Sequence, residues 1–195
     1  MPKIQAPTVV LHRELRRQQL IDAAMELALT DGAQSITVAA VAAKAGLARS
    51  SIYEYFASSA DLVADLVLEE LDYYTQRLAD AVGSATDPYE RIELWITESL
   101  HYVADGRHML IKSLNTINTP AARKDEISLG HRRMMAPLHK SLIETEIGDA
   151  RVAAALLASV TDAASIRIDA GNDAGLEIQS AVTFALAGLR ALAQE

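Results

Sequence analysis

Apolar residues recur every three to four positions along almost the whole chain, and this helical period constrains the fold more than any other feature. No segment shows the strict alternation of apolar and polar residues that marks a half-buried strand. Glycine and proline, which interrupt helices, are few, at 9 and 5 of 195 residues. The sequence therefore predicts an all-α protein of about nine helices, large enough for one or two domains.

Local signals place the boundaries of these helices. The first helix is expected near residues 13–30, and a short one near residues 48–56. Gly130 and Pro137 are expected to bend or break the helix in which they lie. The residues that favour helix starts by capping are Thr37, Ser58 with Asp61, Asp87, Thr119 and Asp149.

Composition narrows the class of protein. The chain has no cysteine, which excludes disulfides, thiol catalysis and cysteine zinc sites. No uncharged apolar run reaches the ~18 residues that span a bilayer, and the N-terminus lacks the apolar core of a signal peptide. We therefore expect a soluble, cytoplasmic protein.

Charge is unevenly distributed along the chain. The formal net charge is −8, which by itself argues against a nucleic-acid partner. However, residues 1–56 carry six Lys/Arg against five Asp/Glu, a net of +1, while the remaining 12 bases and 21 acids give −9. The N-terminal quarter is thus electrostatically distinct, and any contact with DNA is expected there.

Two short helical segments joined by Gly46 form a helix-turn-helix pattern. In the second segment Ile52 and Phe56 face inward, whereas Arg49, Ser50 and Tyr53 fall on the opposite face. An α-helix fits the major groove, where arginine can donate two hydrogen bonds to a guanine edge. The alternative is an ordinary helical corner with a solvated polar face.

The stretch "AAMELALTDGAQSITVAAVAAKAGLARSSIYEYFASSADL" resembles the N-terminal domain of the TetR family of transcriptional repressors. The pattern comprises an Ala-rich helix ending in Gly, Thr-x-x-x-Val-Ala-x-x-Ala-Gly-Leu, and a short helix ending in Tyr-x-Tyr-Phe before a Ser-x-x-Asp-Leu cap. The resemblance covers about a quarter of the chain. It implies a three-helix helix-turn-helix domain at residues 1–57 and a helical effector-binding and dimerisation domain at residues 58–195.

The resemblance also suggests roles for individual residues. Thr37 matches a phosphate-contacting cap, and Tyr53 and Tyr55 match phosphate-binding positions. Two positions depart from the family pattern: Ala48 stands where Ser or Thr often caps the recognition helix, and Ser59 replaces a common lysine. The candidate DNA-binding residues are Thr37, Lys44, Ala48, Arg49, Ser50, Ser51, Tyr53 and Tyr55.

The last two helices are apolar over much of their circumference and rich in small residues, so they need cover on more than one side. The resemblance implies that they pair with those of a second subunit in a four-helix bundle; the alternative is a purely intramolecular core. The candidate interface residues are Val152, Leu156, Val160, Val182, Leu186 and Leu189.

Aromatic, methionine and polar residues between these two regions are candidates for a small-molecule effector pocket, although core packing is the alternative for each of them. The candidates are Trp95, His101, Tyr102, His108, Met109 and Met134, with Asn115 and Asn118 nearby. We expect an apolar or aromatic effector and no cofactor.

Enzymatic readings have little support in the sequence. Glu98-x-x-His101 matches half of a di-iron site, but no second copy is found. A mononuclear metal site on His101, His108 or His131 remains possible, as does a helical module without DNA binding. The resemblance therefore implies a non-enzymatic, ligand-responsive repressor that binds a palindromic operator as a homodimer; the alternative is a helical metal- or small-molecule-binding protein or enzyme without DNA binding.

Overall fold

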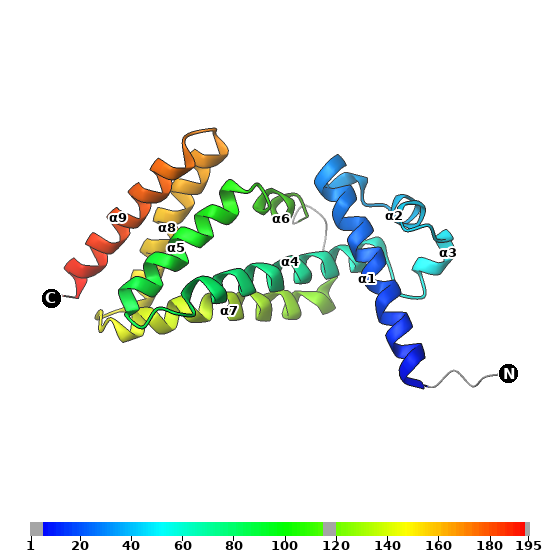
Figure 1. Cartoon of the computed structure of the whole chain (residues 1–195), viewed down its shortest axis with the longest axis horizontal. Helices are drawn as coiled ribbons and strands as arrows, with labels where there is room; N and C mark the ends of the chain where they lie inside the picture. The colour runs from blue at the N-terminus through cyan, green and yellow to red at the C-terminus, as the bar shows by residue number, and fades with distance from the viewer. Residues whose placement is uncertain (1–5, 115–119, 194–195) are drawn as a thin grey trace. The chain divides into compact units, whose positions relative to one another are not determined.

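The computed structural model describes residues 6–114 and 120–193 of the chain. Within these ranges it contains nine α-helices, one short 3-10 helix and no strand (Figure 1). The predicted all-α class is therefore confirmed. Asn115, Asn118 and Thr119 lie outside the described residues.

Contacts divide the chain into two units, which are described separately. The first unit comprises Met1–Glu69 and Leu110–Ile127, and the second comprises Glu70–Met109 and Ser128–Glu195. Helices α4, α6 and α7 each contribute residues to both units. The expected border between residues 57 and 58 stays a prediction.

The first unit is built around three helices from the N-terminal part of the chain. Helix α2 contacts both α1 and α3. At its core, Leu20, Val41, Ile52 and Phe56 expose no more than 1% of their surface. The elements are α1 (Ala6–Asp31), η1 (Ala33–Ser35), α2 (Val38–Lys44), α3 (Arg49–Ile52) and the first part of α4 (Ser59–Val82).

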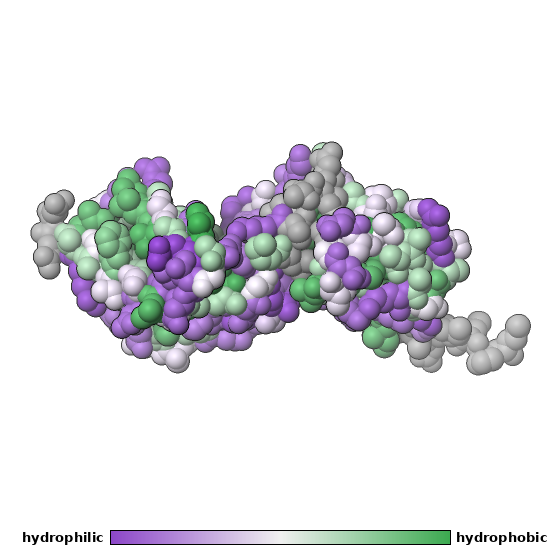
Figure 2. Space-filling model, turned by 90° about the horizontal axis from the view of Figure 1, so that it is seen from above, coloured by the Kyte–Doolittle hydropathy of each residue, from purple (hydrophilic) through white to green (hydrophobic). Residues whose placement is uncertain are grey.

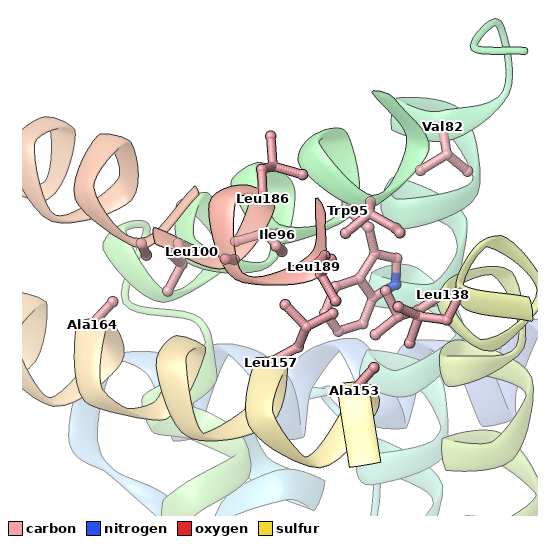
Figure 3. Close-up of a cluster of buried hydrophobic side chains, with 14 of the residues drawn as sticks. Val82, Trp95, Ile96, Leu100, Leu138, Ala153, Leu157, Ala164, Leu186 and Leu189 are labelled. Atoms are coloured by element: carbon pink, nitrogen blue, oxygen red, sulfur yellow. The ribbon is translucent and has the colours of Figure 1, made fainter. Parts of the chain in front are cut away.

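The second unit has its core where α5 packs against both α8 and α9. Figure 3 shows Trp95 of α5 surrounded by aliphatic side chains, among them Leu138, Leu157 and Leu189. The elements, besides the rest of α4, are α5 (Pro88–Ala104), α6 (His108–Leu114), α7 (Ala121–Glu144), α8 (Ala150–Asp169) and α9 (Ala174–Leu192).

The capping signals act as the sequence predicts. The Thr37 hydroxyl accepts the N–H of Ala40 at 3.1 Å, and Asp87 accepts that of Glu90 at 2.9 Å. Asp149 accepts the first N–H groups of α8, and the Ser58 hydroxyl accepts the N–H of Asp61. Each cap satisfies backbone donors that a helix start leaves unpaired.

The predicted start of the first helix is wrong, as is the break allowed for at Gly130 and Pro137; a bend at these residues stays a prediction. Helix α1 begins at Ala6 rather than near Arg13, because Pro7 falls in the first turn, where its missing N–H costs no hydrogen bond. Helix α7 runs through Gly130 and Pro137 without a break. A Cβ at Gly130 would lie 3.1 Å from the Leu71 side chain, so this glycine permits the close approach of α4 and α7 rather than ending a helix.

Candidate functional site

The turn between α2 and α3 fixes the geometry of the helix-turn-helix. Gly46 adopts a φ of +68°, a left-handed conformation that favours glycine. The N–H of Leu47 donates to the carbonyl of Ala42 at 2.9 Å, which satisfies the end of α2. Helix α3 then starts at Arg49 with Ala48 as its N-cap, and the alanine side chain supplies no capping bond. The tight turn brings the two helices into contact.

Helix α3 is shorter than predicted, since the regular helix ends at Ile52. The chain continues as a tighter turn, in which the N–H groups of Tyr53, Glu54 and Tyr55 bond to carbonyls three residues back. The segment from Arg49 to Phe56 therefore remains coiled, as required for its two apolar side chains to share one face.

The orientation of this segment agrees with the sequence pattern. Ile52 and Phe56 are each 1% exposed and anchor it to the core. Arg49 and Ser50 are exposed, and Tyr53 keeps 54% of its surface accessible. The outward face consequently presents a guanidinium, a hydroxyl and a phenol, which are donors suited to phosphate oxygens and base edges. The remaining candidates are Thr37 and Ala48, which are exposed, and Ser51 and Tyr55, which are half-buried.

Lys44, at the end of α2, is engaged within the protein. Its ammonium lies 2.5 Å from a carboxylate oxygen of Glu26 in α1, and both groups are partly exposed. A DNA phosphate would have to compete with this carboxylate for Lys44. The sequence alone gave no sign of the pairing, because the residues are 18 positions apart.

Helix α1 supports the segment from Arg49 to Phe56, called the recognition segment below. It does so through two arginines whose structural role the sequence pattern did not reveal. Arg13 donates to the backbone carbonyl of Glu54 at 3.1 Å. The Arg17 guanidinium lies 5.8 Å from the centroid of the Phe56 ring, within cation–π range. These contacts hold the end of the recognition segment against α1.

In the second unit, the candidate effector residues do not form one group. Trp95 is 7% exposed inside the core cluster, and Met134 packs against the same cluster. His101 is exposed, and Met109 keeps 52% of its surface accessible. His108 is half-buried, with Nε2 2.7 Å from a carboxylate oxygen of Asp169. The described geometry therefore brings together Trp95 and Met134, whereas the exposed side chains of His101 and Met109 do not join them.

Tyr102 belongs to a buried polar cluster instead. Its hydroxyl donates to the carboxylate of Glu70 at 2.9 Å, and its ring stacks on Tyr74 with centroids 4.1 Å apart. Arg107 donates twice to the same carboxylate, at 2.8 and 2.5 Å. Burial, with the Glu70 charge, raises the pKa of Tyr102, and burial raises the pKa of Tyr74 to about 12. Both phenols therefore stay protonated at neutral pH.

One side of the α8–α9 pair is apolar and uncovered. Phe184 exposes 71% of its surface, and Val152 and Leu156 expose 53% each. Figure 2 shows hydrophobic residues gathered over the part of the surface that α8 and α9 form. Of the predicted interface residues, Val160 and Val182 are half-buried, and Leu186 and Leu189 lie in the core of the unit. The open groove is lined by Leu156, Val160, Ala163, Phe184, Gly188 and Leu192.

In the described parts of the chain, no group of three or more His, Cys, Asp or Glu side chains is arranged to hold a metal ion. Glu98, named above as half of a possible metal motif, pairs with Arg77 at 2.5 Å. None of the described helices combines the length and hydropathy needed to cross a bilayer.

Residues 20–66, about a quarter of the chain, match the family described as bacterial regulatory proteins, tetR family. The fatty acid metabolism regulator protein of Bacillus subtilis is 27% identical over 93 residues, 48% of each chain. The transcriptional repressor KstR2 of Mycobacterium tuberculosis is 33% identical over 78 residues, 40% of this chain and 39% of that protein. The matches thus span about half or less of the length of these relatives.

A solved structure resembles nearly the whole chain. The transcriptional regulator FadR of Bacillus subtilis, in complex with stearoyl-CoA, superposes with a TM-score of 0.70 and 21% identity. The superposition covers 88% of this chain and 98% of that one. At this identity the likeness establishes a shared fold.

Proposed function

We propose that this chain, whose residues 20–66 match the tetR family of bacterial regulatory proteins, is a cytoplasmic, ligand-responsive repressor that binds a palindromic operator as a homodimer. The observation that carries the proposal is the outward face of the recognition segment. Arg49, Ser50 and Tyr53 are exposed there, while Ile52 and Phe56 are fully buried behind them. This arrangement presents polar donors on a rigid support.

These donors determine which contacts the recognition segment could make in the major groove of DNA. The Arg49 guanidinium can make two parallel hydrogen bonds to a guanine edge in the major groove. Ser50 and Tyr53 can donate to phosphate oxygens, which fixes the orientation of the segment without reading sequence. Thr37 is the N-cap of α2, and its exposed hydroxyl can donate to another phosphate.

Dimerisation is supported by the uncovered apolar side of α8 and α9. Phe184, Val152 and Leu156 would lose contact with water if the same surface of a second copy covered them. A two-fold axis would also give the dimer two recognition segments, one from each protomer, so that half-sites about 34–36 Å apart could be read together.

The effector is proposed to bind in the second unit, at or near the apolar core around Trp95. The surroundings of this residue are aliphatic, which favours an apolar ligand or an apolar portion of one. Since FadR was solved with stearoyl-CoA, long-chain acyl-CoA compounds are sensible first probes. Effector binding is proposed to favour a state that fits the operator less well and thereby to release DNA.

The test is to select DNA ligands from random duplexes with the purified protein, and then to measure binding by the double variant R49A/Y53A. Both side chains are exposed, so the variant should fold as the wild type does. It should lose at least about 30-fold in operator affinity, since a good base contact is worth ~1–3 kcal/mol and the proposed dimer makes it twice. The variant K124A, on an exposed position of α7, is the control. Equal affinity of R49A/Y53A and wild type, or no selected sequence at all, would refute the proposal.

A further inference from the structure

Arg123 lies near the start of α7, yet it belongs to the first unit, with α1 to α3. It is about 70 residues beyond the recognition segment in the chain and lies outside the 20–66 stretch that matches the family. No sequence pattern connects it with DNA binding. Its importance follows from the contacts of its guanidinium.

The guanidinium of Arg123 bridges two aspartates of α4. Nη1 donates to Oδ1 of Asp61 at 3.0 Å, and Nη2 donates to Oδ1 of Asp65. Nε lies 2.9 Å from Glu126, although not in a hydrogen-bonding direction. A planar guanidinium can reach two carboxylates at once, whereas a lysine ammonium is a single point charge on a flexible stem.

Each of these aspartates also accepts a second hydrogen bond, from a group at or near the recognition segment. The second oxygen of Asp61 accepts the N–H of Ala57, the residue that directly follows Phe56. The second oxygen of Asp65 accepts Nη2 of Arg17 at 2.5 Å, and Arg17 lies over the Phe56 ring. Two separate routes therefore lead from Arg123 to the end of the recognition segment, one through backbone and one through a side chain.

Burial makes the network sensitive to loss of either arginine. Asp65 is only 4% exposed, and a carboxylate removed from water needs charged partners. With Arg123 absent, Arg17 would be the only described arginine left on this carboxylate, and Asp61 would lose the cation that the structure shows beside it. Arg17 would then be expected to shift, and with it the contact to Phe56.

We infer that Arg123 is a positioning residue for the recognition segment: it holds Asp61 and Asp65, which in turn fix Ala57 and Arg17 against Phe56. This inference rests on the proposed function for its consequence, which is correct presentation of Arg49 and Tyr53 to DNA. The contact network itself can be tested without DNA.

The experiment compares R123Q with K124Q, an exposed neighbour that changes the net charge equally, and with R123K. Amide hydrogen exchange is followed in peptides covering residues 49–57 and in peptides from α8 and α9. R123Q should accelerate exchange in residues 49–57 by about tenfold or more, leave α8 and α9 unchanged, and weaken binding to the selected operator by about tenfold. K124Q should match wild type, and R123K should fall between wild type and R123Q, because a lysine keeps the charge but not the two-way bridge.

Unchanged exchange in residues 49–57 of R123Q would overturn the inference, as would equal acceleration in every peptide, which indicates general destabilisation. R123K, which retains the charge, decides the question if R123Q does not fold: wild-type exchange and affinity in R123K would exclude the two-way bridge. If the wild type binds no DNA while R123Q still accelerates amide exchange in residues 49–57, the proposed function fails but the positioning contact stands.

Discussion

Replacement of Phe184 by alanine should separate the proposed dimer into monomers. Phe184 leaves 71% of its surface exposed, which for a side chain of about 200 Å² is ~140 Å². At ~25 cal/mol per Å² the burial of this area would contribute about 3.5 kcal/mol per protomer, or ~7 kcal/mol per symmetric dimer. Allowing for incomplete burial at the interface, we expect a loss of about 3–4 kcal/mol, which raises the dimer Kd by roughly 200- to 1000-fold.

Sedimentation velocity over a dilution series measures this shift directly. The matched control is I143A, since Ile143 on α7 is 68% exposed but lies outside the α8–α9 surface. I143A should dissociate at the same concentration as wild type, whereas F184A should dissociate at a much higher one. The reasoning is refuted if F184A and I143A dissociate together, or if the wild type is a monomer throughout the series.

Three further predictions concern single residues. E26Q should release Lys44 from its ion pair, so binding to random duplex DNA should tighten and its salt slope should steepen by about one phosphate contact; an unchanged slope in titrations would contradict this. T37A should lower the free energy of unfolding by about 1 kcal/mol in urea titrations, because the Ala40 N–H loses its cap, and T37S should restore it. An effector that enters the second unit's core should change the emission of Trp95, the chain's single tryptophan, saturably; an effector that releases DNA without that change binds elsewhere.

The fold could be predicted from the sequence because its signals are local. Capping side chains bond to N–H groups two or three residues further on, as Thr37 and Asp87 do, so a short window contains both partners. The break allowed for at Gly130 was wrong because the structural reason for a glycine at this position is not local. It makes room for Leu71, and only the packed structure shows that neighbour.

The outward face of α3 could also be predicted, because Ile52 and Phe56 lie one helical turn apart and fix which side is buried. The α8–α9 surface could not be divided in the same way. Helices that are apolar all round give no periodic sign of which side packs within the chain. Leu186 and Leu189 consequently appear in the core of the unit, whereas Phe184, Val152 and Leu156 are among the large side chains left outside.

Part of the positive charge of the first 56 residues is engaged within the protein, and this affects how DNA recognition can work. Arg13 donates to a backbone carbonyl, Arg17 neutralises Asp65, and Lys44 is paired with Glu26. The ion pairs of Arg17 and Lys44 reduce the charge available to phosphates, and the rest of the chain carries a net charge of −9. Sequence-independent affinity should therefore be weak, because it depends on counterion release by such cations. Under the proposed function, useful affinity must come from base contacts by Arg49, made twice by a dimer, which is why positioning of the recognition segment and pairing of two chains matter more here than total charge.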